Sequence, residues 1–315
     1  MSFALRPMVE ADHPRIVAII NAQVPDPTTL EEFRRGIELR PKTDPVLRLV
    51  AVTGEGVIAG YGIASGGELN EPGSFTISVR VEAAYQRQGL GTRLLQALEP
   101  WCAEQGAQHL DGGVQERHPQ AIAWAEGKGY RKRHHLFQSR LTLDGFDATP
   151  FLGPLERARA EGFRIISLAE LPAADETYQE LYAFYLETGR DVPGQEQMPE
   201  IPYDLFEKAM IQHPRFEPAA IFVALDGDRW AAIAHMFRRQ DGSYYHQYTG
   251  VRREYRGRGL STAVKAAALQ WAMATGVPAL VTHNHSANQR MLAVNRKMGY
   301  QPEPGLFMLR KSLAG

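Results

Sequence analysis

A single cysteine, Cys102, occurs among the 315 residues of the chain. One thiol cannot form an internal disulfide, and it cannot supply a cysteine-rich zinc site. The sequence also lacks an uninterrupted apolar run long enough to span a bilayer, and the stretch Met1–Arg6 has no apolar core of signal-peptide length. We therefore expect a cytoplasmic protein that does not associate with membranes.

The chain also has no excess of charge of one sign. It contains 35 Lys and Arg residues and 36 Asp and Glu residues, so its formal net charge is −1. A nucleic-acid partner requires a basic surface that neutralises phosphates, so we expect none. Hydrophobic residues make up 44% and charged residues 23% of the chain, which is typical of a soluble globular protein. The length suits two domains or one large one.

The main feature that is present is an internal repeat. A shift of 170 residues aligns 81–140 with 251–310 without a gap and gives fifteen identities over sixty positions, where chance gives about three or four. A period of this length indicates a duplicated domain and not a solenoid, whose repeats are ~20–50 residues long. We predict an N-terminal domain over 1–145, a linker over 146–162 and a C-terminal domain over 163–315.

The order of apolar and turn-forming residues predicts the same α/β fold in both halves, a mixed and mostly antiparallel central sheet flanked by helices. The periodicity predicts one opening strand, one or two helices and an antiparallel meander before each of the repeated segments. The predicted strands are 3–8, 47–52, 57–64, 74–81, 163–168, 220–225, 230–237 and 243–251, and the predicted helices are 11–22, 29–39, 175–189 and 203–212.

Two glycine-rich turns occupy equivalent places in the repeat. Tyr85–Thr92 follows a strand that ends at Val81, Tyr255–Thr262 follows a strand that ends at Val251, and a helix follows each turn. Such a turn presents backbone N–H groups at a helix N-terminus, which suits a phosphate, and flanking arginines add charge-assisted contacts. Neither turn has the Gly-Lys-Ser/Thr ending of an NTPase loop or the Gly-x-Gly-x-x-Gly dinucleotide pattern. The recurrence favours an anion-binding role over an exposed turn that needs glycine for its geometry alone.

The pattern of these turns is Gln-x-x-Gly-x-Gly over 86–91 and Arg-x-x-Gly-x-Ser over 256–261. Both resemble the acetyl-CoA loop of the GCN5-related N-acetyltransferase (GNAT) family, and the second departs from it only by serine at a small-residue position. The run Asn288–Tyr300, with its final Gly-Tyr pair, resembles a later helix of this family and the ending that follows it. The resemblance covers both halves, and the layout is similar to that of mycothiol-synthase-like tandem acetyltransferases.

The resemblance implies two tandem GNAT-like domains and an N-acetyltransferase that uses acetyl-CoA as its acyl donor. We expect no metal, because His283 and His285 of the run His283-Asn284-His285 lie on one face of a strand without the further ligands that a metal site requires. In such an enzyme the amine of a small molecule or a peptide attacks the thioester directly. The family also implies which residues hold the cofactor: strand residues whose backbone meets the acetyl group, the loop residues, and an asparagine that opens the later helix. In this sequence these are Val79, Val81, Gln86, Arg87, Gln88, Gly89, Leu90, Gly91 and Thr92 in the first half, and Thr249, Val251, Arg256, Gly257, Arg258, Gly259, Leu260, Ser261, Thr262 and Asn288 in the second half.

Catalytic residues are expected in the second half, because the first half has Ala125 where the second has Asn295. His246 is the candidate base, since the unperturbed pKa of histidine is near 6.5. A histidine that serves packing, or a base that acts through water or comes from elsewhere, stays open. Many relatives have a tyrosine at the position of Asn295 that donates to the thiolate, whereas an amide can hydrogen-bond a thiolate but cannot readily deliver a proton. The first half is expected to bind acetyl-CoA or to be structural.

A second hypothesis belongs to a different class of function: the chain is a non-catalytic acyl-CoA-binding or regulatory protein. The walls of an acceptor site are expected within 24–42 and 188–216, because early helices and loops vary most in this fold. The duplication suits a pseudo-dimeric monomer or a homodimer.

Overall fold

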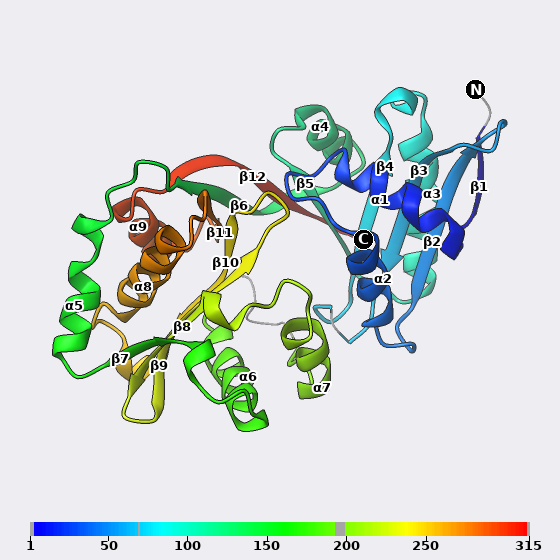
Figure 1. Cartoon of the computed structure of the whole chain (residues 1–315). Coiled ribbons are helices and arrows are strands. Elements are labelled where there is room, and N and C mark those ends of the chain that lie inside the picture. The colour runs from blue at the N-terminus through cyan, green and yellow to red at the C-terminus, as the bar shows by residue number, and fades with distance from the viewer. Residues whose placement is uncertain (1–2, 69, 193–198, 314–315) are drawn as a thin grey trace. The chain divides into compact units, whose positions relative to one another are not determined.

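The computed structural model describes residues 3–68, 70–192 and 199–313, and Figure 1 shows their helices and strands. These residues divide into two compact units. The first unit contains the chain up to His134 and again from Leu306, and the second is built from residues between His135 and Gly305. Within the described residues, no helix is both long and apolar enough to cross a membrane.

The sheet of the first unit has the strand order β1-β2-β3-β4-β5-β12. Its neighbouring strands are antiparallel except for β4 and β5, which run parallel. The strands are β1 (Phe3–Pro7), β2 (Val46–Thr53), β3 (Ile58–Ser65), β4 (Ser74–Val81), β5 (His109–Gln115) and the later part of β12 (Gln301–Ser312), and the helices are α1 (His13–Asn21), α2 (Leu30–Glu38), α3 (Leu90–Glu104) and α4 (Pro119–Gly127).

Helices cover both faces of this sheet because neighbouring residues of a strand point to opposite faces. On β2, Val50 packs with Ile16 and Ile19 of α1, whereas Ala51 beside it belongs to a cluster with Leu90 and Leu94 of α3. None of these six side chains is more than 2% exposed. The predicted sheet flanked by helices is therefore confirmed in this half.

The second unit repeats the arrangement with the strand order β7-β8-β9-β10-β11-β6. Its only parallel pair among the described strands is β10 with β11. The strands are β7 (Arg164–Ser167), β8 (Ile221–Asp226), β9 (Arg229–Arg238), β10 (Tyr244–Val251), β11 (Ala279–His285) and the later part of β6 (Arg131–Thr142), and the helices are α5 (Gly153–Ala160), α6 (Asp175–Gly189), α7 (Tyr203–Phe206) with a π-helical turn (Glu207–Ile211), α8 (Leu260–Ala274) and α9 (Gln289–Lys297).

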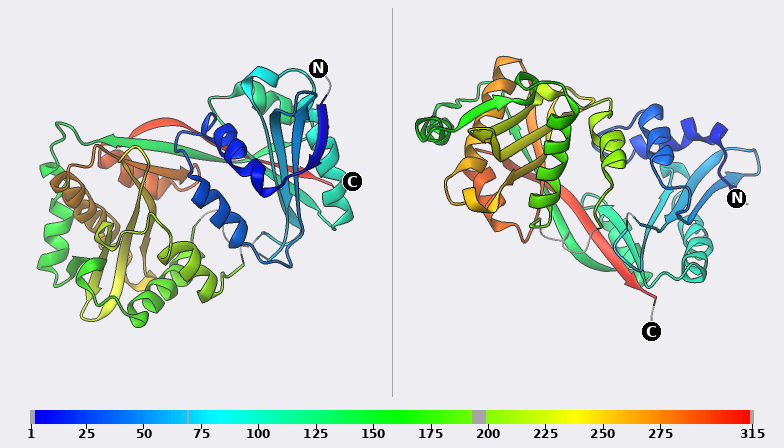
Figure 2. Two further views of the ribbon diagram at one scale, coloured as in Figure 1. Left: turned by 45° about the vertical axis from the view of Figure 1, so that its right-hand side comes forward. Right: turned by 90° about the horizontal axis from the view of Figure 1, so that it is seen from below.

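The two faces of the second sheet also pack against different helices. Ile221 of β8 lies in a cluster with Phe184 of α6, and its neighbour Phe222 lies in a cluster with Leu269 of α8. Figure 2 shows α6 and α8 on opposite sides of these strands. The predicted α/β fold with a mixed sheet is confirmed in this half as well.

Each unit contains a strand from the other half of the repeat. Leu306–Ser312 of β12 pairs antiparallel with β5 in the first unit. Leu136–Thr142 of β6 pairs antiparallel with β11 in the second unit. The predicted domains, 1–145 and 163–315, keep each last strand within its own half, so the observed units differ from them by this exchange.

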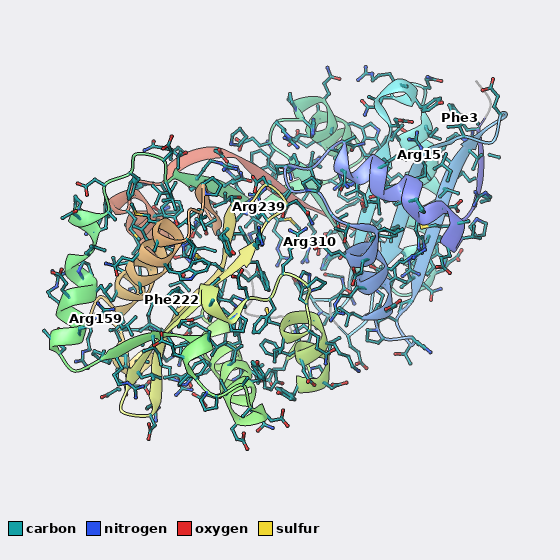
Figure 3. The ribbon with its side chains drawn as sticks, viewed as in Figure 1. Phe3, Arg15, Arg159, Phe222, Arg239 and Arg310 are labelled. Carbon is teal, nitrogen blue, oxygen red and sulfur yellow. The ribbon has the colours of Figure 1, made fainter. Side chains whose placement is uncertain are left out.

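Arg310 fixes the exchanged strand in the first unit and is labelled in Figure 3. Its guanidinium donates to Asp111 at 2.6 and 2.7 Å, to Glu71 at 2.9 and 3.0 Å, and to Ser74 Oγ at 3.0 Å. The Arg310 side chain is only 16% exposed, so water screens these ion pairs weakly. Hydrogen bonds from Arg310 first, and then from Arg133, lower the pKa of Glu71 to about 2.

Candidate active site

The loop between β4 and α3 turns through two residues with left-handed backbone. Gly89 is the N-cap of α3 with φ +80°, and Arg87 has φ +64°. The equivalent residues of the second unit are Gly259 at +76° and Gly257 at +81°. This conformation costs an L-residue ~1–2 kcal/mol but is open to glycine. Both loops therefore have left-handed backbone at the same two positions. The first loop has an arginine, Arg87, at one of these positions, and its backbone is strained there.

The first side chain of each loop ties the loop to the strand before it. Gln86 Nε2 donates to the carbonyl oxygen of Val81 at 3.0 Å, and Arg256 Nε donates to the carbonyl oxygen of Val251 at 3.1 Å. These hydrogen bonds occupy equivalent places in the repeat. The two predicted cofactor residues at these positions therefore hold the loops in shape through their own side chains.

A cleft of about 970 Å³ lies in the first unit, where β4 and β5 separate. Parallel pairing stops at Thr76 opposite Asp111, although both strands continue. The N-terminal ends of α3 and α4 complete the walls of the cleft. Of the residues predicted to bind the cofactor in this half, all but Gln88 are among the lining residues, namely Val79, Val81, Gln86, Arg87, Gly89, Leu90, Gly91 and Thr92.

Sequence reasoning missed several other residues that line this cleft. Gly112 and Gly113 of β5 line it, and a Cβ atom on Gly112 would come within 3.2 Å of the carbonyl oxygen of Ile77. Leu95 of α3 and Ala125 of α4 are apolar residues of the same lining. Two consecutive glycines, Gly112 and Gly113, in the segment after the helix of the first loop are the signal that could have found this close approach.

The arginines of the two loops differ in their partners. Arg87 has no ion-pair partner among the described residues. In the second unit, Arg256 pairs with Asp191 at 2.5 Å and Arg258 pairs with Glu161 at 2.9 Å. Such exposed pairs are worth ~0–1 kcal/mol, so a phosphate can displace them at small cost. The first loop is free of this competition.

Replacing the strained arginine separates stability from ligand binding. In Arg87→Gly, the free energy of unfolding should stay the same or rise by up to ~1 kcal/mol, because glycine adopts the left-handed turn without strain. Acetyl-CoA binding to the first unit should weaken about tenfold or more, since a charge-assisted hydrogen bond is worth ~1.5–3 kcal/mol. Urea denaturation and calorimetric titration measure the two effects. Gly257→Arg is the matched control and should destabilise by ~1 kcal/mol; weaker stability in Arg87→Gly would contradict this account of the loop.

In the second unit, β10 and β11 separate at the place equivalent to the cleft. Their parallel pairing ends with His246 opposite Thr282. A bulge between His246 and Tyr248 then shifts the register of β10 on β9. The predicted backbone contacts, Thr249 and Val251, follow this bulge, and the predicted loop residues lie between the end of β10 and the first turn of α8, namely Arg256, Gly257, Arg258, Gly259, Leu260, Ser261 and Thr262.

A buried lysine contacts Asn295, one of the two residues that were predicted to be catalytic, and lies near Tyr300, which also neighbours the other, His246. Lys265 of α8 is 1% exposed, and its Nζ donates to Asn295 Oδ1 at 2.7 Å. The same Nζ lies 5.1 Å from the ring centre of Tyr300, and the rings of Tyr300 and His246 lie 6.3 Å apart. Burial lowers the pKa of Lys265 to about 7. Burial and then Lys265 hold the pKa of His246 well below its usual range, so the imidazole is neutral near pH 7.

Asn288 opens helix α9, as the resemblance suggests. Its Oδ1 accepts a hydrogen bond from the backbone N–H of Met291 at 3.2 Å, which is the contact of an N-cap asparagine. This side chain therefore stabilises the helix, and its role toward a cofactor stays a prediction.

A chain of polar contacts connects the start of the predicted acceptor segment 188–216 to the second sheet; residues 193–198 of that segment lie outside the described residues. The hydroxyl of Tyr248 donates to Thr188 Oγ1 at 2.6 Å, and the rings of Tyr248 and Tyr185 stack 4.5 Å apart. The hydroxyl oxygen of Tyr185 lies 2.7 Å from His235 Nδ1. Burial lowers the pKa of His235 to about 3, so this histidine is neutral in the folded chain.

The buried His235 should make the second unit sensitive to acid. Below a pH of ~6.5 the unfolded chain binds a proton at this histidine, whereas the folded chain resists it, so stability falls as the pH falls toward 3. Between pH 7.5 and pH 5 this one group should remove about 2 kcal/mol of unfolding free energy. Urea denaturation of the wild type and of His235→Gln measures the difference. Equal acid sensitivity of the two proteins would show that His235 is not the source.

Comparison with known proteins places this arrangement in a family. The model of the acetyltransferase (GNAT) family matches residues 14–130 and again residues 179–300. A mycothiol acetyltransferase of Clavibacter michiganensis subsp. michiganensis (strain NCPPB 382) is 27% identical over 259 residues, which are 82% of this chain and 77% of that protein.

Two solved structures share the fold over the whole chain. A GCN5-related N-acetyltransferase from Sphaerobacter thermophilus has a TM-score of 0.71 at 21% identity and covers 98% of this chain and 95% of its own. A tandem GNAT protein from the clavulanic acid biosynthesis pathway has a TM-score of 0.74 at 16% identity and covers 100% of this chain and 99% of its own.

The chain therefore belongs to the GNAT acetyltransferase family and has one family match in each half. The predicted family, the tandem α/β fold and the class of acyltransferase enzyme are confirmed. Enzymes of this family transfer acyl groups from acetyl-CoA to amines.

Proposed function

We propose that this protein transfers the acetyl group of acetyl-CoA to the amine of a small molecule or a peptide. The observation that carries the proposal is the repeated junction of strand, loop and helix, with left-handed turns at residues 87 and 89 and again at 257 and 259. Each junction presents backbone N–H groups at a helix N-terminus, as a pyrophosphate requires. The similarity to a mycothiol acetyltransferase supports an acetyl donor and leaves the acceptor open.

The cleft of the first unit fits the donor. Its loop end offers Arg87 and the start of α3 to the pyrophosphate, and its inner wall offers apolar Leu95 and Ala125 to a pantetheine chain and an acetyl methyl group. The backbone of Val79 and Val81 lines the region where the strands separate. We propose that one acyl-CoA molecule, acetyl-CoA, binds in this cleft. We propose that a second acyl-CoA molecule binds at the equivalent place in the second unit, between β10 and β11.

The second unit is our proposed place of chemistry. The amine nitrogen attacks the thioester carbonyl carbon, so a C–N bond forms and the C–S bond breaks. Backbone N–H groups near Thr249 and Val251 are the proposed donors to the developing oxyanion. The amine loses a proton and the thiolate gains one, with free pKa values of ~10.4 for a lysine-like amine and ~8.5 for a thiol.

His246 and Asn295 are the proposed catalytic side chains. The neutral imidazole can accept the proton of the amine, directly or through water, although its lowered pKa makes it a weak base. Asn295 can donate a hydrogen bond from its amide nitrogen, since its oxygen is occupied by Lys265. In the first unit the residues equivalent to His246 and Asn295 are Ile77, once the bulge of β10 is taken into account, and Ala125, so that unit has neither group.

A non-catalytic acyl-CoA-binding protein is the second candidate. One observation favours it: Lys265 stands in the second unit where Leu95 lines the cleft of the first. Tight acyl-CoA binding without amine-dependent turnover is the behaviour this candidate requires.

Release of CoA thiol from acetyl-CoA, measured with a panel of primary amines that includes amino sugars, amino-acid conjugates and peptides, tests the proposal. We expect release that depends on one class of amine and yields the acetylated amine by mass spectrometry. Bound acetyl-CoA with no amine-dependent release over the panel would contradict the enzyme and favour the binding protein.

A further inference from the structure

The repeat places a charged group of the second unit where the first unit has an apolar wall. Lys265 is equivalent to Leu95, and Asn295 is equivalent to Ala125. Leu95 and Ala125 both line the cleft of the first unit. Two copies of one fold therefore present different chemistry at the same two positions.

The polar side chains around Lys265 are buried, and several of their atoms have no hydrogen-bond partner among the described residues. Asn295 is 2% exposed and His246 is 3% exposed. Within the part of the chain that the structure describes, Asn295 Nδ2, both ring nitrogens of His246 and the hydroxyl of Tyr300 make no hydrogen bond. A buried donor without a partner destabilises the fold, and here several occur around one ammonium group.

Asn284 of β11 extends the group toward the separated strands. It is 6% exposed, and its Nδ2 also has no partner among the described residues. Asn284 lies two residues beyond Thr282, the residue opposite His246, and therefore on the same face of the sheet. Its equivalent in the first unit, Val114, lines the cleft.

This cluster of Lys265, Asn295, His246, Tyr300 and Asn284 contains several donors that have no partner among the described residues. The ammonium of Lys265 has no ion-pair partner in the described parts of the chain, and Asn295 Oδ1, the acceptor it contacts, is already used. Amide and ammonium nitrogens can only donate. The complement of such a cluster is an anion with acceptor oxygens, and a carboxylate supplies them.

We infer that the second unit takes an acyl-CoA whose acyl group ends in a carboxylate, with this carboxylate bound by Lys265 and by its neighbours Tyr300 and Asn284. The inference rests on the acyl transfer of the proposed function, and it replaces acetyl-CoA by a carboxylate-bearing acyl-CoA as the preferred donor of this unit. The loop and the separated strands hold the CoA portion as in the first unit, and the polar cluster replaces the apolar wall that suits an acetyl methyl group. The transfer itself is unchanged: the C–S bond breaks and the C–N bond to the amine forms.

Calorimetric titration of the full chain with acetyl-CoA, malonyl-CoA and succinyl-CoA tests this inference. The variant Gly89→Asp isolates the second unit, and Gly259→Asp isolates the first. In Gly89→Asp we expect at least one of the two carboxylate-bearing donors to bind tenfold or more tightly than acetyl-CoA. In Gly259→Asp only the first unit can bind a donor, and its cleft is lined by the apolar Leu95. We therefore expect no preference for a carboxylate-bearing donor in this variant.

Lys265→Met in the Gly89→Asp background should remove the preference and leave acetyl-CoA affinity within about threefold. Equal affinity of the three donors in Gly89→Asp overturns the inference, and that comparison does not depend on whether Lys265→Met folds. A loss of all three affinities together in Lys265→Met also overturns it. If the three affinities are equal and amine-dependent release persists, the inference fails and the proposed function stands; if neither binding nor release occurs in Gly89→Asp, both fail for this unit.

Discussion

Acetyl-CoA binding to the first unit is expected to fall at least 100-fold in Gly89→Asp. Gly89 has φ +80° at the N-terminus of α3, and a Cβ atom there would point into open space. An aspartate would place negative charge beside the pyrophosphate, where two unit charges ~4 Å apart repel by ~4 kcal/mol near a protein surface. Calorimetric titration should show the loss of one binding site per chain.

Gly106→Asp is the matched control for this loss. Gly106 also has a left-handed backbone, with φ +84°, and open space at its Cβ position, but it does not line the cleft. Both variants should lose ~1–2 kcal/mol of unfolding free energy from backbone strain. Binding that is equally weak in both variants would mean that the loss reflects instability, and intact binding in Gly89→Asp would remove the loop from the cofactor site.

The second large effect is expected on stability, in Arg310→Met. This change leaves the carboxylates of Glu71 and Asp111 close together and takes away the five hydrogen bonds of Arg310. Breaking a mostly buried ion pair by removing one partner costs ~3–5 kcal/mol, and we expect about 3 kcal/mol because Arg133 still pairs with Glu71. Urea denaturation at pH 7 measures the loss.

Arg140→Met provides the control, since Arg140 is equivalent to Arg310 in the repeat. Arg140 is 30% exposed and contacts Glu303 at 3.1 Å, so its loss should cost ~1 kcal/mol or less. The pKa of Glu71, lowered to about 2, adds a pH signature. Its stabilisation is present above ~4.5 and is lost as the pH falls toward 2. In Arg310→Met the part of the unfolding free energy that is lost at acid pH should be smaller than in the wild type. Equal losses of unfolding free energy in Arg310→Met and Arg140→Met would contradict the larger contribution assigned to Arg310.

The repeat made the fold and the loops predictable from the sequence. Gly89 and Gly259 align because each must adopt a left-handed turn before a helix, and no other residue does so without strain. The same alignment predicted two copies of a mixed sheet. Strand and helix identities follow from periodicity, which is a local property of the chain.

The exchange of the last strands could not be predicted in this way. Leu136 and Arg140 of β6 are equivalent to Leu306 and Arg310 of β12, so either strand carries the pattern that either sheet needs. Which sheet it joins depends on long-range partners, such as Asp111 for Arg310. Periodicity within one strand does not contain that information.

Lys265 was missed for a related reason. It lies beside Val264 in a helix whose residues are mostly alanine and other apolar side chains, where a lysine is usually solvent-exposed. The alignment with Leu95 was the available signal, because a lysine in place of a residue on the buried face of the equivalent helix is unusual. Its contact with Asn295, 30 residues away, required the packed structure.

We propose that catalysis takes place in the second unit. The most direct test measures amine-dependent CoA release in the variants Gly259→Asp and Gly89→Asp. The assay uses the amine class that the panel identifies and the donor that the wild type uses best. Gly276→Asp, with φ +72° and open space at its Cβ position, controls for strain in the second unit. We predict that Gly259→Asp loses turnover at least 100-fold, while Gly89→Asp and Gly276→Asp keep most of it. Turnover that survives in Gly259→Asp and disappears in Gly89→Asp would contradict catalysis in the second unit and place it in the cleft of the first.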